Sequence, residues 1–268
     1  MPIIFLKSLI LGLVVIKKLT KIVFIIFLSL FVAQSVCAKN YFIIEKSPLP
    51  PQEESAKTDG LPQDVLAFAM NAYTYALKRN EVHNPFFLTV IDFDMPSYKK
   101  RLWVIDLHND HVIMNIHVAQ GSNSGKIYAT RFSNRIGSHE SSLGVFTTVG
   151  AEYHGKFGES LHLKGLELGI NDNAYYRGII IHSEQDVSPD FIRTMGYAGQ
   201  TWGCFAVNPD HIDRLIELLQ GGSVVYVYAS PEKNDLNVNH DMSSGIEEVY
   251  NAIVRINANT IARFFHAF

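Results

Sequence analysis

The chain has 268 residues, of which 47% are hydrophobic and 18% charged, and its formal net charge at pH 7 is −3. This composition excludes a disordered chain and suits one substantial globular domain, with or without a small appendage. The charge balance also argues against nucleic acid as a partner, because phosphate binding requires clustered Lys and Arg side chains.

Residues 1–38 have the features of a secretory signal. Four lysines precede the uncharged run 22–36, and Val36-Cys37-Ala38 gives a small-x-small ending. A basic region, an apolar region and small residues at the cut define such signals. We therefore predict a signal peptide over 1–38, cleavage after Ala38, and a periplasmic or cell-envelope location.

Two alternatives to cleavage stay open. An uncleaved segment would be a membrane anchor, and the membrane would then be a partner through this N-terminal segment only. However, the apolar run is shorter than the roughly 20 residues of a spanning helix. A lipid anchor on Cys37 is disfavoured because Val36 stands where a small residue is expected.

The exported chain would be acidic and would hold a single thiol. Without residues 1–38 it has 19 basic and 26 acidic residues, a formal charge of −7, and Cys204 is its one cysteine. Cysteines in exported proteins usually pair into disulfides. A lone exported cysteine therefore calls for a functional reason.

The flanks and the first helix follow from composition. Residues 39–60 contain three closely spaced prolines and little periodicity, which indicates a linker. Apolar residues at helical spacing over 61–79 predict an amphipathic helix at the start of the main domain, 61–230. Residues 231–268 are predicted to be a polar segment followed by a C-terminal helix.

The main domain is predicted to be mainly β with a few peripheral helices. Asn109-Asp110 indicates a hairpin turn, so the first three strands should form an antiparallel meander. A helix is predicted at 209–220, where Gly221-Gly222 ends it. Runs of β-branched and aromatic residues predict strands at 86–93, 101–108, 111–121, 144–149, 161–164, 178–182 and 223–229.

A histidine and the cysteine stand out in "GIIIHSEQDVSPDFIRTMGYAGQTWGCFAV", residues 178–207. Strand alternation places Ile179 and Ile181 on one face and His182 on the other. "WGCFAV" is an apolar run that would lie beside this strand. A cysteine attacks as its thiolate and needs a neighbour that accepts its proton, so His182 and Cys204 are a candidate base and nucleophile.

Gly203 gives the backbone before the thiol access to a tight or left-handed turn. In such a turn the amides of Trp202, Gly203 and Cys204 can converge on a carbonyl oxygen, as acyl transfer requires. The alternative is that Cys204 is a buried small hydrophobe and His182 a structural histidine.

Long stretches resemble a known family: "LGVFTTVGAEYHGKFGESLHLKGLELGINDNAYYRGIIIHSEQ" and "GQTWGCFAVNP" are similar to the catalytic domain of murein L,D-transpeptidases of the Trp-Gly-Cys branch. The similarity runs from about 62 to 228. It implies an L,D-transpeptidase-like β-sandwich or barrel that acts on peptidoglycan stem peptides through a thioester. It also implies that Cys204 is the nucleophile, His182 the base and the amides around Gly203 the oxyanion donors, with no metal or organic cofactor.

Four positions depart from the family pattern. Trp202 replaces a histidine of the better-studied branch, and Ser183, Gln200 and Phe205 stand where glycine, arginine and a small residue or proline are usual. These departures bear on substrate preference more than on chemistry.

Several residues have both a substrate-binding and a structural interpretation. Arg177 would pair with a stem-peptide carboxylate or with an ordinary Asp or Glu. Thr201 would orient the turn or bind substrate, or simply cap the turn. Trp202 would line the peptide cleft or lie in the core, and residues 138–140 would form a loop near the site. The predicted substrate-binding set is Trp202, Thr201, Arg177, Ser183 and Gln200.

Other functions remain in competition. An L,D-carboxypeptidase would share the same acyl-enzyme, and a non-catalytic wall-binding module would retain the fold without the chemistry. A papain-like protease is disfavoured because its cysteine precedes its histidine in the chain. His108, His111 and His117 lie close in sequence, but a zinc site needs three or four converging ligands, and a hairpin favours His108 and His111 as turn residues over zinc ligands.

Overall fold

The computed structural model describes residues 60–156 and 158–231. These residues belong to one of the two units into which the chain divides, Ala56–Phe268. The predicted signal peptide, the linker up to residue 59 and the C-terminal segment from 232 lie outside the described residues. No helix in the described part of the chain is long and apolar enough to cross a membrane.

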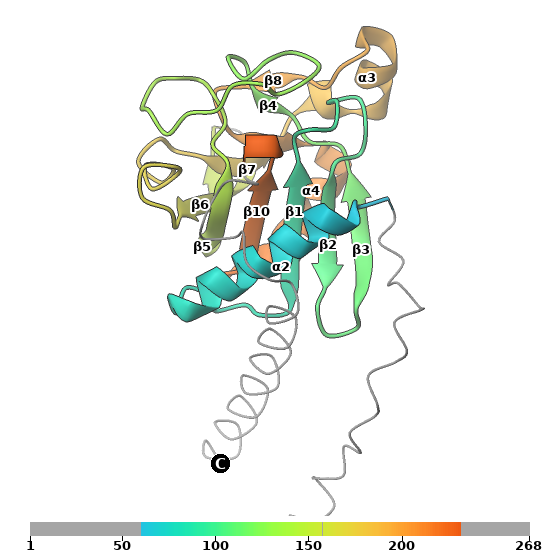
Figure 1. The fold of residues 1–268 in the computed structure, drawn as a ribbon. Helices are drawn as coiled ribbons and strands as arrows, with labels where there is room; N and C mark the ends of the chain where they lie inside the picture. Colours follow the sequence, from blue (N-terminus) through green and yellow to red (C-terminus); the bar gives the residue numbers. More distant parts are fainter. Residues whose placement is uncertain (1–59, 157, 232–268) are drawn as a thin grey trace, which may run out of the picture. The chain divides into compact units, whose positions relative to one another are not determined.

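An eight-stranded sheet forms the body of the domain (Figure 1). Its strand order is β3-β2-β1-β10-β5-β6-β7-β9, in which the pairs β1–β10 and β7–β9 are parallel and the others antiparallel. The strands are β1 (Phe87–Asp92), β2 (Leu102–Asp106), β3 (His111–Ile116), β5 (Gly144–Gly155), β6 (Gly158–Gly165), β7 (Ile180–Ser183), β9 (Phe205–Val207) and β10 (Val224–Tyr228). The predicted meander of the first three strands and the mainly β class are confirmed.

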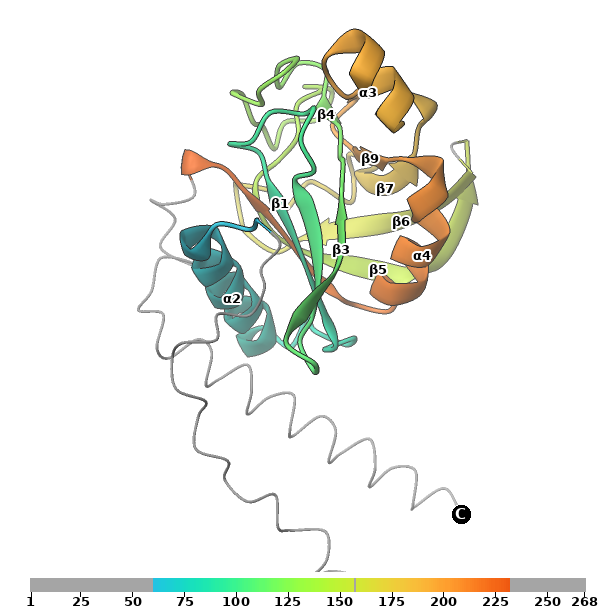
Figure 2. The ribbon, with the colours of Figure 1, turned by 90° about the vertical axis from the view of Figure 1, so that its right-hand side faces the viewer.

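The sheet curls so that its two ends approach each other. The Ala119 amide, just after β3, donates a hydrogen bond of 2.9 Å to the Ala206 carbonyl of β9. A small parallel sheet lies next to this contact, formed by β4 (Gln120–Gly121) and β8 (Gln200–Thr201). The result is a nearly closed barrel, as Figure 2 shows from the side.

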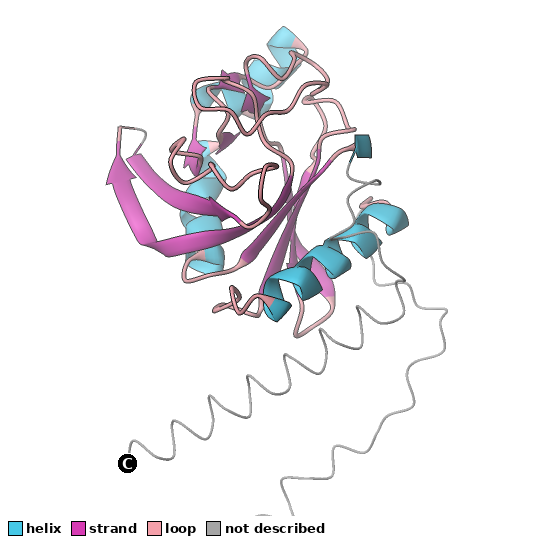
Figure 3. Ribbon diagram, turned by 60° about the vertical axis from the view of Figure 1, so that its left-hand side comes forward, coloured by secondary structure: helices cyan, strands magenta, loops and turns pink. Residues whose placement is uncertain are grey.

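Two long helices pack against the sheet. Helix α2 (Gln63–Lys78) buries Val65, Ala69 and Tyr73 in an apolar cluster with β1, β5 and β10. Helix α4 (Pro209–Leu219) buries Leu215 and Leu219 in the barrel core. Both helices are where their periodicity predicts them, and Figure 2 shows them on different sides of the sheet. Figure 3 shows how the helices surround the strands.

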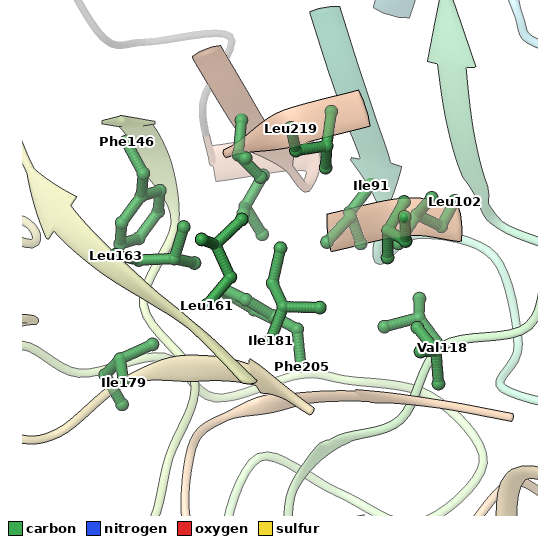
Figure 4. Packing of buried hydrophobic residues seen from close by; sticks show 14 of the residues in the cluster. Ile91, Leu102, Val118, Phe146, Leu161, Leu163, Ile179, Ile181, Phe205 and Leu219 are labelled. Atoms are coloured by element: carbon green, nitrogen blue, oxygen red, sulfur yellow. The ribbon is translucent and has the colours of Figure 1, made fainter. Parts of the chain in front are cut away.

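The barrel core gathers apolar side chains from most strands (Figure 4). Ile179, Ile181 and Phe205 contribute to it and are at most 1% exposed. Burying one such side chain contributes about 1.5–3 kcal/mol. This burial fixes which face of β7 and β9 points inward, and hence which face carries the polar residues.

One helix was not predicted. Helix α3 (Pro189–Met195) lies in the excursion between β7 and β9, after the short 3-10 turn η1 (Gln185–Val187). Its signals were present: Ser188 caps its first turn, Pro189 occupies the first helical position, and Gly196 ends it with φ +77°. The helix is short, so its apolar periodicity is weak.

Candidate active site

The pairing of β7 with β9 brings His182 and Cys204 to the same side of the sheet. Ile181 is in register with Phe205, and both point into the core. Alternation therefore turns His182 and Cys204 away from the core. His182 is in register with Ala206, two positions beyond Cys204. Side chains on one face of a strand recur every two residues, so the imidazole lies one such repeat further along the strands than the thiol.

The Cys204 thiol is half-buried at the edge of β7. Its Sγ lies 3.5 Å from the Gly178 carbonyl oxygen. Burial raises the pKa of Cys204 above its usual range, and the Ile180 N–H and the charge of Arg177 oppose that rise. A thiol held mainly protonated needs a base to become nucleophilic.

His182 has the properties of such a base. Its side chain is 2% exposed, and Nδ1 lies 3.1 Å from the Ser183 carbonyl oxygen. A proton on Nδ1 satisfies that carbonyl and leaves the lone pair on Nε2. Burial lowers the pKa of His182, while the Ser183 hydrogen bond and the charge of Asp186 oppose the change. The imidazole is thus neutral and basic near neutral pH.

The turn before the thiol is built by Thr201 and Gly203. The Thr201 hydroxyl accepts the Gly203 N–H at 3.1 Å and donates to the Cys204 carbonyl at 2.7 Å. Gly203 has φ +115°, and a Cβ there would lie 2.8 Å from the Glu140 carbonyl oxygen. Only glycine fits this conformation and contact.

The three amides predicted as oxyanion donors differ in whether they already have an acceptor. Because the Gly203 amide donates to Thr201, its role is to shape the turn. Within the described residues, the amides of Trp202 and Cys204 donate no hydrogen bond to another protein group. These two amides are therefore the ones available to a developing oxyanion.

Arg177 is engaged by the loop 133–142. Its guanidinium donates to the carbonyl oxygens of Ser133 and Glu140 and to the hydroxyls of Ser138 and Ser142. The expected ion pair with a carboxylate is not found among the described residues, where its partners are neutral acceptors. The side chain is half-buried and already has four acceptors, which leaves it poorly placed to bind a substrate carboxylate.

Trp202 lies on the surface beside the cysteine turn and not in the core. It is 74% exposed, and one face stacks on His139 with ring centroids 4.8 Å apart and planes 5° apart. His139 adopts φ +57°, which is uncommon for a residue with a side chain. The sequence placed residues 138–140 near the site but gave no signal for this stack.

A comparison with protein families agrees with this geometry. The chain matches the family of L,D-transpeptidase catalytic domains over residues 57–228, a span that includes both His182 and Cys204. The chain belongs to this L,D-transpeptidase family. The resemblance predicted from the sequence is thereby confirmed. No curated protein sequence matches the chain.

Solved L,D-transpeptidases resemble the chain at low identity. The enzyme from Mycobacterium smegmatis is 16% identical with a TM-score of 0.34, and the match covers 54% of this chain and 59% of that one. The protein from Stackebrandtia nassauensis is 13% identical with a TM-score of 0.34, covering 63% and 68% of the two chains. The protein from Xylanimonas cellulosilytica is 14% identical with a TM-score of 0.31, covering 61% and 78%.

Two more predicted residues of this L,D-transpeptidase-family domain hold the site together. Ser183 acts through its backbone carbonyl, which contacts the His182 imidazole. Gln200 is exposed on β8, and its Nε2 donates to the carbonyl oxygens of Ser122 at 3.2 Å and Gly125 at 2.6 Å. The side-chain amide of Gln200 thus stabilises the turn 122–125.

Asp186 was missed by the sequence interpretation. A Cβ on Gly199 would lie 1.9 Å from the Asp186 carboxyl group, so the carboxyl packs directly on that glycine. It also accepts a hydrogen bond from the Gln200 backbone and interacts with His182. Burial raises the pKa of Asp186. This residue connects the end of the histidine strand to the start of the cysteine turn.

The three histidines considered as zinc ligands lie at and just after the β2–β3 hairpin. His108 and His111 are exposed at the β2–β3 turn, and His117 is half-buried beyond β3. Among the described residues, no group of three or more His, Cys, Asp or Glu side chains is arranged to hold a metal ion.

Proposed function

We propose that this protein is a cysteine acyl transferase that acts on peptidoglycan stem peptides by L,D-transpeptidation. Family membership supports the reaction class. The observation that carries the proposal is the parallel pairing of β7 with β9, in which Ile181 is in register with Phe205. Alternation along both strands supports a position of His182 and Cys204 on the same face. The reaction then needs only groups that this face provides.

In the first half-reaction, Nε2 of His182 removes the proton from Cys204 as Sγ attacks the carbonyl carbon of the L-to-D peptide bond after the third stem residue. The amides of Trp202 and Cys204 hold the oxyanion. Protonated His182 then gives its proton to the departing amine as the peptide bond breaks. The product is a thioester on Cys204.

In the second half-reaction, an amine from a neighbouring stem attacks the thioester carbon. His182 takes the proton of that amine and returns it to the departing sulfur, which restores the free thiol. The net result is one peptide bond exchanged for another. If water replaces the amine, the same thioester is hydrolysed and the enzyme is an L,D-carboxypeptidase. The thiol is only half-buried, so water can reach the thioester, and this observation supports hydrolysis as the alternative.

The test is incubation of the purified protein with defined muropeptides, followed by mass spectrometry. We expect a thioester mapped to Cys204 and a cross-linked dimer, and Cys204→Ala should abolish both. A shortened stem without a dimer would identify the carboxypeptidase. The transferase proposal fails if neither adduct nor product forms. If, in addition, the unchanged protein and Cys204→Ala bind sacculi equally well, a wall-binding module remains.

A carbapenem gives an independent test, because opening of its β-lactam ring by a nucleophile leaves a stable acyl-enzyme. We expect one adduct at Cys204, and its loss in both Cys204→Ala and His182→Ala. An adduct that persists in His182→Ala at an unchanged rate would show that the imidazole is not the base.

We further propose that the protein acts in the periplasm or cell envelope. The basic and apolar pattern of residues 1–38 supports export, and the proposed substrate lies in that compartment.

A further inference from the structure

Arg177 occupies a central place beside the cysteine turn that the proposed mechanism does not use. It lies in the turn that leads into β7. Its guanidinium donates hydrogen bonds to four acceptors, all of them in the loop 133–142. A planar guanidinium can hold several acceptors at fixed angles in a way that a lysine ammonium cannot. The loop is thus attached to the histidine strand through one side chain.

The same side chain packs directly on the cysteine turn. A Cβ on Gly203 would lie 3.1 Å from Nη2 of Arg177 and 2.8 Å from the Glu140 carbonyl oxygen. That carbonyl is itself an acceptor of Arg177. The Ser141 hydroxyl adds a second connection, because it donates to the Gly203 carbonyl oxygen at 3.2 Å. Loop, guanidinium and turn are therefore in mutual contact.

Arg177 also fixes the loop on both sides of His139. It donates to the Ser138 hydroxyl at 3.2 Å and to the Glu140 carbonyl. Between these two contacts His139 has φ +57°, and its ring covers one face of Trp202. A left-handed residue with a side chain persists only where its surroundings hold it. Arg177 shares that support with Asn123, whose backbone N–H donates to the His139 carbonyl at 3.1 Å and whose Nδ2 donates to the Ser138 carbonyl at 2.8 Å.

The charge of Arg177 interacts with the Cys204 thiol and lowers its pKa, against the larger effect of burial. Its positive charge attracts the Cys204 thiolate and the Glu140 carboxylate. The Glu140 carboxylate also lies 3.6 Å from Arg131. Of the carboxylates near the histidine, Glu184 lies 3.8 Å from Nδ1 of His182 and Asp186 interacts with the imidazole. Arg177 is thus the cation that acts on the sulfur.

We propose that Arg177 is a positioning residue that clamps the loop 133–142 onto the Gly203 turn and places a fixed positive charge opposite the Cys204 sulfur. This inference deepens the proposed function and rests on Cys204 as its nucleophile. One side chain then sets both the reactivity of the thiol and the His139–Trp202 wall beside it.

The first measurement is the pH dependence of alkylation of Cys204 by iodoacetamide, in the full chain, with adducts mapped by mass spectrometry so that Cys37 is counted separately. Loss of one nearby cation moves a thiol pKa by about one unit or more. We therefore expect Arg177→Gln to shift the alkylation midpoint upward and to slow the reaction at neutral pH about tenfold. Arg177→Lys, which retains the charge, should fall between Arg177→Gln and the unchanged chain.

The second measurement is acrylamide quenching of Trp202. The chain has two tryptophans, and Trp103 is 1% exposed. The part of the quenching that is lost in Trp202→Phe therefore measures the exposure of Trp202. Both Arg177→Gln and Arg177→Lys should increase this quenching, because neither side chain holds the loop at four points. The matched control is Arg135→Gln, an exposed arginine on the same loop, which should change neither measurement.

A folded Arg177→Gln protein with an unchanged alkylation midpoint and unchanged quenching would overturn the inference. If Arg177→Gln does not fold, Arg177→Lys decides the matter, and unchanged quenching in that variant would also overturn it. Alkylation requires no peptide substrate. A shifted midpoint in a protein that makes no transfer product would therefore leave Arg177 as a positioning residue and refute only the proposed reaction.

Discussion

At the scale of single residues, the site depends on short hydrogen bonds that orient groups before substrate arrives. The Ser183 carbonyl sets the tautomer of His182, and the Thr201 hydroxyl links Gly203 to the Cys204 carbonyl. Amides held in place in advance stabilise an oxyanion without reorganisation at the moment of reaction. The proposed reaction therefore depends on the residues that orient His182 and the turn as well as on Cys204.

Thr201→Val tests the turn. It removes the acceptor of the Gly203 N–H and the donor to the Cys204 carbonyl, and an unsatisfied buried donor costs about 1–3 kcal/mol. We expect acylation by a carbapenem to slow by about 10- to 100-fold. Thr201→Ser retains the hydroxyl and should stay close to the unchanged chain. Equal rates for Val and Ser would show that the hydroxyl does not shape the turn.

The pH profile of acylation tests the base. Because burial lowers the pKa of His182, the basic form persists below its ordinary pKa of about 6.5. Activity should therefore rise with pH through a midpoint below that value and then level off, since the pKa of Cys204 is raised. Stopped-flow acylation from pH 4 to 10 measures this. A rising limb centred near pH 8 or above would point to direct titration of the thiol instead.

At the scale of secondary structure, parallel pairing of two short strands creates the site. Strands β7 and β9 are short, but Ile181 and Phe205 are in register and bury fully in the core. A shift of one residue would turn His182 into the core and Ile181 outward. Burial energy thus specifies the positions of His182 and Cys204, the proposed catalytic groups.

Ile181→Ala tests this coupling. Truncation of a buried isoleucine costs about 2–5 kcal/mol, because it leaves a cavity. We expect that loss in the free energy of unfolding in urea, together with slower acylation. Leu168→Ala is the matched control, because Leu168 is 89% exposed and should leave both quantities unchanged. A loss of stability without slower acylation would mean that the register survives the cavity.

At the scale of the whole molecule, a nearly closed barrel presents the site on its outer surface next to the loop 133–142. The Ala119–Ala206 hydrogen bond joins the ends of the sheet beside β9. The cysteine turn is thereby held between the strand pairing below it and the Arg177 loop next to it. The molecule needs both to keep Trp202, Gly203 and Cys204 in one arrangement.

Export is the prediction that belongs to the whole chain. If residues 1–38 are a cleaved signal, the protein recovered from the cell envelope should begin at Lys39, as mass spectrometry of the intact protein would show. A protein that keeps residues 1–38 and fractionates with membranes would support the anchor instead. Recovery of the chain from the cytosol alone would contradict both.

The sequence by itself determined the class of fold and the family, and it named His182 and Cys204 as the candidate pair. Local periodicity marked α2, α4 and most of the strands. Alternation in "RGIIIH" placed Ile179 and Ile181 on one face of the strand, and in the structure both lie in the barrel core. These features depend on neighbours a few residues apart, which a sequence displays directly. The family resemblance extended them to a reaction.

Only the tertiary structure decided how the groups meet. It assigned the Gly203 amide to Thr201, gave Arg177 four acceptors from a distant loop, and placed His139 on Trp202. These contacts join residues that are far apart in the chain or oriented by a left-handed turn. They depend on burial and hydrogen bonding over the whole barrel, which a local sequence pattern does not show.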